Sequence, residues 1–453
     1  MDLLKKIEQK TAVICIIGLG YVGLPTSLIF AKKGFRVIGV DILEEKVDII
    51  NSGISPIHDT FLQENLPKQL ESGNFNATTE YQAAVSNADI ILLMLPTPAN
   101  EAKEPDLTFV INATSSVAKY LRKGQLVILE STVYPGVTEE IVCPILEKSG
   151  LEASIDFGLA YCPERFNPGD TDRSIEKVTR VIGGINTQWT EIANALYSQI
   201  QLTFSTVDIK TAEASKVIEN AQRDLNIAFA NEMALICEHL SIDFNDVFRA
   251  ASTKWNFVRY YPGPGVGGHC LPHDPYYLVK KAREHGYHAQ IILAGRKVND
   301  FMPHHVMDLL VRGLNHNQKA VKGSKIIIFG ATYKKNIDDL RTSPTELLVN
   351  YLRDYEAEIL IIEPYVERNL VFGCKRINQA NSQTISEADA LIFMVNHDEF
   401  SDISTEYIKS CFEGKKGIVI VDGVRMLNGY ELKESGFFYF AVGAGKINTS
   451  YRG

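Results

Sequence analysis

Short runs of apolar residues alternate with longer amphipathic segments over the first 200 residues of the chain. The apolar runs cover residues 13–17, 37–40, 90–95 and 126–129. Runs of this length, separated by segments with helical spacing, predict buried strands alternating with helices. That order of elements is typical of a parallel, doubly wound sheet covered by helices on both faces.

The last 130 or so residues repeat this pattern, with apolar runs at 325–329, 358–362, 390–395 and 418–421. The two halves also share local details: Ala-Asp precedes the run at 90 and again the run at 390. The sequence therefore predicts an α/β fold with two Rossmann-like, doubly wound domains.

The middle of the chain differs, because residues 206–240 contain neither glycine nor proline and are rich in Ala, Glu, Lys and Leu. This composition predicts one long helix within a central helical domain that joins the two outer domains. We expect the domain limits to be 1–204, 205–310 and 311–453.

Composition excludes several classes of protein. Of the 453 residues, 45% are apolar and 22% are charged, as in an ordinary soluble protein, and the net charge of -9 argues against nucleic acid as the main partner. The charged N-terminus and short apolar runs predict neither a secretory leader nor a membrane span. Seven cysteines without a CxxC pair indicate the reducing cytoplasm, and ten histidines without a ligand pattern predict no metal site.

The first expected strand ends in a glycine-rich turn, Gly18-Leu19-Gly20-Tyr21-Val22-Gly23, which opens the next predicted helix. GxGxxG between a strand and a helix is the fingerprint of a dinucleotide site, where helix N–H groups meet a pyrophosphate. Asp41 ends the second strand, where a carboxylate binds a ribose diol and favours NAD over NADP.

A second glycine-rich segment, residues 260–275, leads directly into Cys270. A thiol beside a loop whose amides can approach a ligand suggests covalent catalysis by a thiolate. The alternative is a buried structural cysteine beside a turn. The NAD fingerprint upstream favours the catalytic interpretation.

Three polar residues of the predicted long helix share a face. Lys216 and Asn220 are four positions apart and Arg223 follows on nearly the same side, so together they form either an anion or oxyanion site or a solvated surface. Loops after other strands offer further ligand contacts, since ligands of open α/β sheets bind at the carboxyl ends of strands. These loops contain Pro96, Thr97, Thr132, Glu164 and Arg165.

Six segments occur in order along the chain: GLGYVGLP, LPTP, ESTVYPG, SKVIENAQRDLN, PGPGVGGHCLPHDP and FGATYKKNIDDLRTSP. With these segments the chain resembles the UDP-glucose/GDP-mannose dehydrogenase family of nucleotide-sugar 6-dehydrogenases. Members that oxidise UDP-glucose usually have PEFLxEG and GGSC where this chain has PERFNPG and GGHC. The latter forms are similar to the N-acetylhexosamine branch, which implies UDP-GlcNAc or UDP-GalNAc as substrate, with UDP-ManNAc or UDP-glucose as the alternative.

The resemblance implies a four-electron oxidation of a C6 hydroxyl to a carboxylate with two NAD+ reduced. The aldehyde formed first is captured by Cys270 as a thiohemiacetal, which is oxidised to a thioester and hydrolysed. Lys216 and Asn220 match residues that stabilise the oxyanion, and Asp274 and Glu164 match acids that position or activate water.

The resemblance also implies a homodimer built on the long helix and a role in capsule or O-antigen synthesis. Two other functions stay open: a two-electron dehydrogenase of the β-hydroxyacid type, which needs no reactive thiol, and a non-catalytic nucleotide sensor or scaffold. The expected cofactor contacts are Gly18, Gly20, Tyr21, Val22, Gly23, Asp41, Pro96, Thr97, Thr132 and Arg341. The expected substrate contacts are Arg165, Arg223, Tyr261, Gly263, Gly267, Lys334, Lys335 and Arg425.

Overall fold

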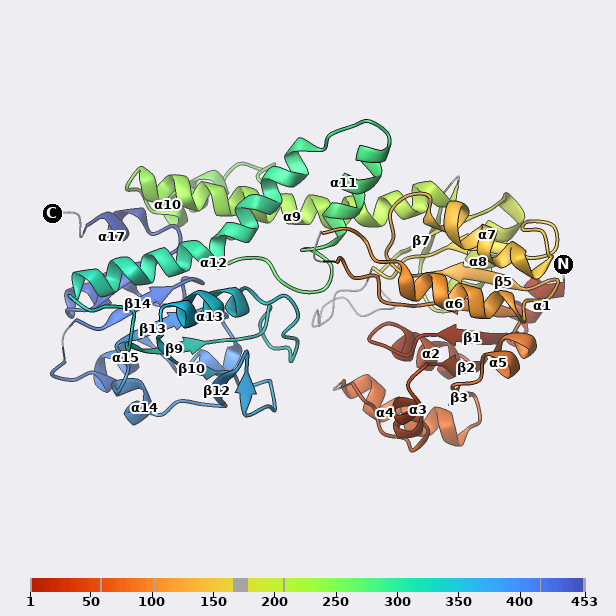
Figure 1. The fold of residues 1–453 in the computed structure, drawn as a ribbon, viewed down its shortest axis with the longest axis horizontal. Helices are drawn as coiled ribbons and strands as arrows, with labels where there is room; N and C mark the ends of the chain where they lie inside the picture. The colour runs from red at the N-terminus through yellow and green to blue at the C-terminus, as the bar shows by residue number, and fades with distance from the viewer. Residues whose placement is uncertain are drawn as a thin grey trace. The chain divides into compact units, whose positions relative to one another are not determined.

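The structure is a computed structural model that describes residues 2–57, 59–100, 103–165, 178–206, 208–415 and 417–450. Its internal contacts divide the chain into two compact units. The first comprises Met1–Glu219 with Tyr276–His288, and the second comprises Asn220–Pro275 with Ala289–Gly453. Each unit contains one large sheet with helices on both faces (Figure 1).

The sheet of the first unit has the strand order β3-β2-β1-β4-β5-β6-β7-β8. Its strands pair in parallel, except for the antiparallel pair of β6 and β7. The order reverses between β1 and β4, where Ile14 pairs with both Val37 and Ile90. The strands are β1 Val13–Ile17, β2 Arg36–Val40, β3 Phe75–Thr78, β4 Ile90–Leu93, β5 Leu126–Leu129, β6 Gly158–Tyr161, β7 Arg180–Gly184 and β8 Thr203–Ser205.

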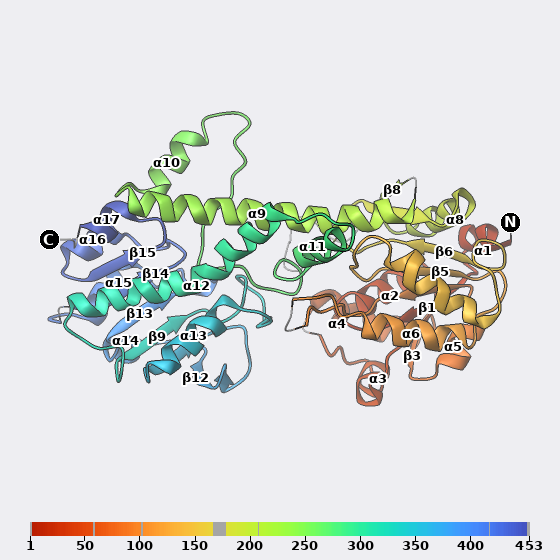
Figure 2. The same cartoon turned by 45° about the horizontal axis from the view of Figure 1, so that its top comes forward.

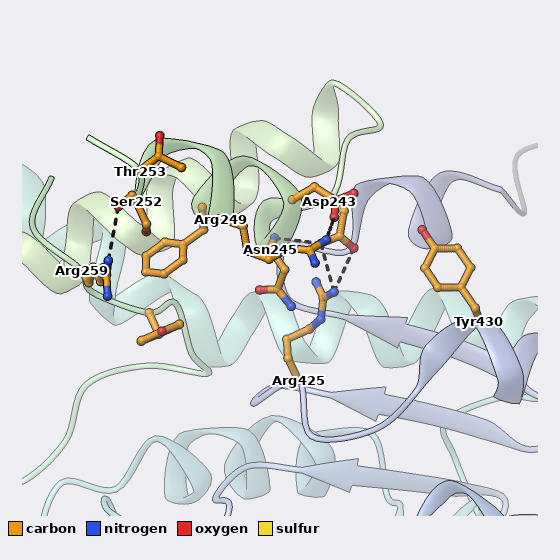
Figure 3. A pocket seen from close by; sticks show the side chains of 11 residues that line it. Asp243, Asn245, Arg249, Ser252, Thr253, Arg259, Arg425 and Tyr430 are labelled. Atoms are coloured by element: carbon orange, nitrogen blue, oxygen red, sulfur yellow. Dashed lines mark hydrogen bonds and ion pairs between the residues drawn. The ribbon is translucent and has the colours of Figure 1, made fainter. Parts of the chain in front are cut away.

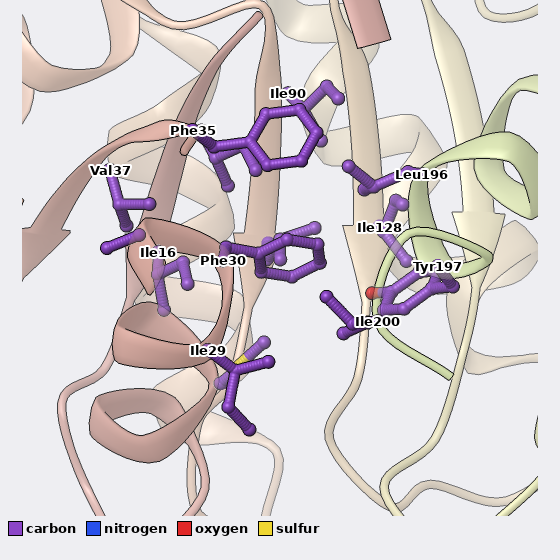
Figure 4. Close-up of a cluster of buried hydrophobic side chains, with 14 of the residues drawn as sticks. Ile16, Ile29, Phe30, Phe35, Val37, Ile90, Ile128, Leu196, Tyr197 and Ile200 are labelled. Carbon is purple, nitrogen blue, oxygen red and sulfur yellow. The ribbon is translucent and has the colours of Figure 1, made fainter. Parts of the chain in front are cut away.

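Two hydrophobic clusters cover the two faces of this sheet, because successive strand residues point to opposite sides. One cluster contains Ile16, Phe30 and Tyr197, which pack with the aromatic and aliphatic side chains drawn in Figure 4. The other contains Ile17 of β1 and Val127 of β5, whose neighbours Ile16 and Ile128 belong to the first cluster. The helices are α1 Asp2–Glu8, α2 Gly23–Lys32, α3 Glu44–Asn51, α4 Thr60–Glu71, α5 Tyr81–Asn87, α6 Thr108–Ala118, α7 Cys143–Leu146 and α8 Thr187–Tyr197, with short turns η1 Thr138–Val142 and η2 Glu147–Ser149.

The sheet of the second unit has the order β11-β12-β10-β9-β13-β14-β15 and is parallel except for β11 with β12. The strands are β9 Lys325–Phe329, β10 Glu358–Ile362, β11 Leu370–Val371, β12 Cys374–Ile377, β13 Ala390–Phe393, β14 Val419–Asp422 and β15 Phe438–Ala441. The helices are α10 Phe244–Ala251, α12 Gln290–His316, α13 Pro344–Asp354, α14 Ser382–Ser386, α15 Thr405–Cys411, α16 Gly429–Glu434 and α17 Gly445–Thr449, with the turn η4 Asp398–Phe400.

The predicted long helix is α9, Ile209–His239, which runs unbroken for 31 residues (Figure 2). Helix α11, Asp274–Glu284, follows the glycine-rich segment. The border between the two units falls inside both helices. The predicted fold class, two Rossmann-like sheets and a long central helix, is confirmed, whereas the three domain limits stay a prediction.

Two predicted strands end earlier than expected. The run at 90–95 is a strand only to Leu93. The Met94 N–H still donates to the Ile17 carbonyl of β1 at 2.9 Å, but the Leu95 N–H donates to Ser131 Oγ at 2.9 Å instead of to a neighbouring strand. The run at 390–395 likewise ends at Phe393. The apolar residues beyond both strand ends belong to loops, so hydrophobicity alone overestimated the length of the strands. Among the described helices, none has the length and apolar content needed to cross a bilayer.

Candidate active site

The glycine-rich turn after β1 has the geometry of a dinucleotide site. Gly18 adopts a φ of 98°, and a Cβ there would lie 2.4 Å from the carbonyl oxygen of Met94. A Cβ on Gly23 would lie 1.8 Å from the Gly18 oxygen, so α2 can approach β1 only without a side chain. A Cβ on Gly20 would meet no protein atom within 4 Å. Gly20 therefore faces space in which a pyrophosphate can reach the backbone.

Asp41 lies beside this turn, as predicted. Its Oδ2 accepts hydrogen bonds from the Leu19 N–H at 3.0 Å and from Lys46 Nζ at 2.6 Å, and its Oδ1 accepts from the Leu43 N–H at 3.2 Å. The sequence prediction missed Lys46, although a lysine five residues after the acid, in the first turn of α3, was the available signal. The turn and this carboxylate together fit NAD.

The side chains of Tyr21 and Val22 lie at the surface of the turn, 53% and 36% exposed. Both residues are therefore accessible to a cofactor seated on the turn.

The loops after β4 and β5 meet at the same edge of the first sheet. Thr97 Oγ1 donates to the Thr132 carbonyl at 2.7 Å; Thr97 is buried, whereas Pro96 before it is exposed. Tyr277, which the prediction missed, donates its hydroxyl to the Thr97 carbonyl. The predicted residues from the two loops therefore lie together, close to the switch point between β1 and β4.

The loop after β6 contains Glu164 and Arg165. Glu164 is bonded to Arg180, the first residue of β7, and the Arg165 guanidinium pairs with Glu219 at 2.6 Å. Arg180 was not among the predicted residues. Residues 166–177 of this loop lie outside the described part of the chain.

Cys270 stands four residues before α11, in the second unit. Its carbonyl accepts hydrogen bonds from the N–H groups of His273 and Asp274, at 3.0 and 2.8 Å, so the thiol residue is part of the turn that starts the helix. Asp274 is buried, and its Oδ2 accepts from Asn220 Nδ2 at 2.6 Å. The structure thus brings together three predicted residues: Cys270, Asp274 and Asn220.

The other two predicted residues of the helix face, Lys216 and Arg223, lie on α9, as expected. Lys216 belongs to the first unit and Arg223 to the second. Lys216 is buried, which argues against the purely solvated helix face that the sequence left open.

The glycine-rich loop before Cys270 packs on the turn after β9. The Gly268 N–H donates to the Arg341 carbonyl at 3.0 Å, and Thr342 Oγ1 donates to the Gly268 carbonyl at 2.7 Å. A Cβ on Gly267 would lie 2.6 Å from Tyr333 Cβ, so this contact requires glycine. The prediction missed Tyr333, although it directly precedes the predicted Lys334 in the FGATYKK segment.

Two side chains near the thiol have perturbed pKa values. Burial, with the positive charge of Arg341, lowers the pKa of His269 to about 4, so this imidazole is neutral at physiological pH. Burial, with the charges of Asp339 and Cys270, raises the pKa of Tyr333 to about 12. Tyr333 therefore remains a hydrogen-bond donor, and His269 supplies no positive charge to the thiol.

Asn231 supports the start of the same loop, because its Oδ1 accepts from the Gly263 N–H at 2.9 Å and its Nδ2 donates to Asn299 Oδ1 at 2.9 Å. Asn299 in turn donates to Asp224 Oδ1 at 2.8 Å, and Arg296 Nη1 donates to the same oxygen at 2.6 Å. These side chains are buried. The loop therefore rests on a fixed polar network. Asp224 lies in the SKVIENAQRDLN segment, but the sequence analysis gave these four residues no role.

A cavity of about 220 Å³ lies at the carboxyl ends of β9 and β13, where the strand order of the second sheet reverses. Lys334 and Lys335 line it together with Pro264 and Gly265 of the glycine-rich loop. Two lysines at a switch point suit an anionic ligand such as a nucleotide pyrophosphate. The predicted lysines therefore lie at one site.

Arg425 lines a different cavity, of about 760 Å³, together with Tyr261 and Arg259 (Figure 3). Its guanidinium pairs with Asp243 at 2.9 Å and 3.2 Å. The structure thus places Arg425 and Tyr261 together and apart from the two lysines. Arg341 lies in the segment between β9 and α13 that contacts the glycine-rich loop, and its side chain pairs with Asp339 at 2.6 Å.

All seven cysteines are free thiols. Within the described ranges, no cluster of three or more His, Cys, Asp or Glu side chains could hold a metal ion.

Comparison with known proteins adds an independent line of support. Three models of the UDP-glucose/GDP-mannose dehydrogenase family match the chain: the NAD binding domain at residues 12–201, the central domain at 210–301 and the UDP binding domain at 327–429. UDP-N-acetyl-D-glucosamine 6-dehydrogenase of Pseudomonas aeruginosa is 39% identical over 91% of this chain and 97% of its own. UDP-N-acetyl-D-mannosamine dehydrogenase of Methanococcus aeolicus is 35% identical over 98% of both chains.

The solved structure of a UDP-D-ManNAc dehydrogenase from Pyrococcus horikoshii superimposes with a TM-score of 0.87 and 31% identity, over 96% of this chain and all of that one. Matches of this extent confirm the resemblance of the six motifs and the expected cofactor. The chain belongs to the UDP-glucose/GDP-mannose dehydrogenase family and is an NAD-dependent nucleotide-sugar dehydrogenase.

Proposed function

We propose that this enzyme oxidises the C6 hydroxyl of a UDP-N-acetylhexosamine, UDP-GlcNAc or UDP-GalNAc, to the carboxylate. The observation that carries the proposal is the turn at Cys270, where the thiol residue, the buried Asp274 and Asn220 are joined by hydrogen bonds. A two-electron alcohol dehydrogenase needs no thiol at its site. A thiol beside a carboxylate–amide pair suits a reaction that captures an aldehyde and carries it to the acid level.

The reaction balances as two oxidations and one hydrolysis. NAD+, when bound, supplies the hydride acceptor for each oxidation. In the first, C6 loses a hydride and its hydroxyl loses a proton, which gives an aldehyde. The Cys270 thiolate then adds to the aldehyde carbon, and Lys216 and Asn220 stabilise the oxyanion of the thiohemiacetal.

Loss of a second hydride from C6 gives a thioester on Cys270. Water then attacks the thioester carbon, the C–S bond breaks, and the carboxylate leaves while the thiolate is regenerated. Asp274 and Glu164 are the carboxylates that hold this water and accept its proton. Arg223 contacts the sugar in this proposal.

The choice of an N-acetylhexosamine is supported by the GGHC and PER forms of the two motifs and by relatives that are named for N-acetylhexosamine substrates. The cavity with Lys334 and Lys335 suits the UDP pyrophosphate. UDP-ManNAc and UDP-glucose are the alternatives. Use of the product in surface polysaccharide synthesis, and a cytoplasmic location, belong to this proposal.

An NADH assay with UDP-Glc, UDP-GlcNAc, UDP-GalNAc and UDP-ManNAc tests the function. We expect two NADH per sugar consumed, with an N-acetylhexosamine as the best substrate. Cys270→Ser should form no uronate, whereas Cys143→Ser, at a similarly half-buried thiol, should retain activity. One NADH per sugar would indicate the two-electron alternative, and none, with retained binding, a nucleotide sensor.

We also propose a homodimer that uses α9. Phe229, Ile236 and Leu240 are 57%, 43% and 63% exposed, and their spacing of seven and four places them on one side of the helix end. Apolar side chains clustered in this way are typical of an association surface. Light scattering should give twice the chain mass, and Phe229→Lys with Ile236→Lys should give the monomer. A wild-type protein that is monomeric would contradict this part of the proposal.

A further inference from the structure

We propose that Arg180 is a positioning residue that fixes the Glu164 carboxylate for hydrolysis of the Cys270 thioester. The inference rests on the proposed function, in which Glu164 holds the hydrolytic water. It concerns a side chain of the first unit that no motif singled out. Arg180 begins β7, and Glu164 lies in the loop that follows β6, the antiparallel partner of β7.

The Arg180 guanidinium bridges two carboxylates, those of Glu164 and Glu130. Its Nη2 donates to Glu164 Oε2, and its Nη1 donates to Glu130 Oε2 at 2.7 Å. Its Nε donates to Gln201 Oε1 at 2.7 Å. Because a guanidinium is planar and rigid, three bonds in one plane fix both the position and the direction of the Nη2 donor that Glu164 receives.

Arg180 is itself held in place by buried side chains. Its side chain is 1% exposed, and Glu130, at the end of β5, is fully buried. Glu130 Oε1 accepts from the Tyr197 hydroxyl at 2.5 Å, and the Tyr197 ring lies 5.3 Å from the guanidinium carbon. Burial opposes the charge of Arg180, but Glu130 and Glu164 together raise its pKa well above the usual value. The guanidinium is therefore a permanent cation.

The second oxygen of Glu164 is also fixed. Glu164 Oε1 accepts from the N–H of Arg165 at 2.7 Å, and Arg165 Nη1 donates to the Thr179 carbonyl at 2.7 Å. The loop residue after Glu164 is thus tied to the residue before Arg180. With a donor on each oxygen, the Glu164 carboxylate is held in one plane.

This arrangement determines what Glu164 can do. In the proposed hydrolysis the Glu164 carboxylate accepts a hydrogen bond from the attacking water. The water oxygen then keeps its lone pair for the thioester carbon, and the proton it loses goes to the carboxylate. Since hydrolysis depends on where the water is held, small displacements of Glu164 slow it strongly. Hydride transfer, which does not involve this water, is not affected in the same way.

The test uses the full-length enzyme and Arg180→Lys, which keeps the charge but loses the fork. Rapid mixing with NAD+ and the best UDP-sugar should still give a fast burst of two NADH per site. The steady rate should fall by up to about 100-fold, with the KM for NAD+ unchanged, and intact-protein mass spectrometry should show the sugar-acyl adduct on Cys270 accumulating.

The matched control is Arg122→Lys. Arg122 also pairs with a carboxylate in the first unit, Asp89 at 3.4 Å, but does not contact Glu164. It should lose stability without accumulating the adduct. A second variant, Glu130→Gln, loosens the anchor of Arg180 in an isosteric way and should give a smaller accumulation. It decides the outcome where Arg180→Lys does not fold.

A folded Arg180→Lys, or failing that Glu130→Gln, with the wild-type hydrolysis rate and no adduct would overturn the positioning role. That result is distinct from failure of the proposed function. In the latter case the wild-type enzyme itself would yield one NADH or none, and Glu164→Gln would leave no adduct.

Discussion

Glu213 provides a prediction that can be worked out from the structure. This residue of α9 is buried and holds the loop after β5: its Oε2 accepts from the Gly136 N–H at 2.5 Å, and its Oε1 accepts from the N–H and Oγ1 of Thr138 at 2.8 and 2.7 Å. That loop also carries Thr132, an expected cofactor contact. Burial raises the pKa of Glu213 from 4.5 to about 7, against the effect of these hydrogen bonds.

The sign of the pH dependence follows from this shift. Between pH 4.5 and 7 the folded protein holds a proton on Glu213 that the unfolded chain has released, so stability falls as the pH rises through this range. With these two pKa values, a change from pH 5 to pH 8 should lower the free energy of unfolding by about 2.5 kcal/mol through this group alone. Below pH 4.5 the contribution is fully present, and above pH 7 it is lost.

The assay is urea unfolding of the whole chain at pH 5 and pH 8, followed by tryptophan fluorescence. The chain has two tryptophans: Trp189, 6% exposed in the first unit, and Trp255, 92% exposed in the second. In a Trp255→Phe background the signal reports the first unit, which contains Glu213. The glutamine of Glu213→Gln does not titrate. The pH dependence of this variant's free energy of unfolding therefore comes from all the other titratable groups and serves as the reference.

We expect the parent to lose about 2.5 kcal/mol more than Glu213→Gln between the two pH values. The glutamine side chain has one acceptor oxygen where the glutamate has two, so the variant should be less stable than the parent at both. An equal loss in the two proteins would refute the reasoning, because it would show that the three hydrogen bonds offset the cost of burial and keep Glu213 ionised at pH 5.

Three further predictions concern the ligand sites. Asp41→Asn, which removes the charge that the ribose diol meets, should raise the KM for NAD+ by about 10- to 100-fold in steady-state kinetics and leave the KM for the UDP-sugar unchanged. Gly23→Ala places a Cβ 1.8 Å from the Gly18 oxygen, so NAD+ should no longer raise the thermal midpoint. Glu363→Gln loosens the bonds from the Ala331 and Thr332 N–H groups, at 2.7 and 3.2 Å, and should raise the KM for the UDP-sugar by about 10-fold without changing that for NAD+.

Local patterns predicted those parts of the site that one segment contains. The GxGxxG turn, Asp41 and the thiol loop could be read from the sequence because each lies where a strand ends or a helix begins. Residues that pair across the chain left no such signal. Arg180 acts on Glu164 from 16 positions away across an antiparallel strand pair, and Arg425 pairs with Asp243 across 182 positions. The order of the elements in space decides such meetings, and sequence spacing does not contain that order.

The two sheets show how one pattern gives two different sites. Asp41 and Glu363 occupy the same place, at the end of the strand next to the first strand of each sheet. Asp41 is 9% exposed, beside a turn with three glycines.

Glu363 is fully buried, with His397 Nε2 3.1 Å from its Oε2 and the N–H of Tyr365 donating to its Oε1 at 3.0 Å. The turn beside it reads Gly-Ala-Thr-Tyr-Lys-Lys, so the second and third glycines are missing. A carboxylate closed off in this way cannot bind a ribose diol, and it fixes the turn instead. The two lysines at the end of that turn offer positive charge where glycine amides and a helix N-terminus suit an anion in the first sheet. The repeated strand pattern therefore gives one turn that suits a dinucleotide and one whose lysine side chains suit an anion, and the number of glycines in each turn distinguishes them.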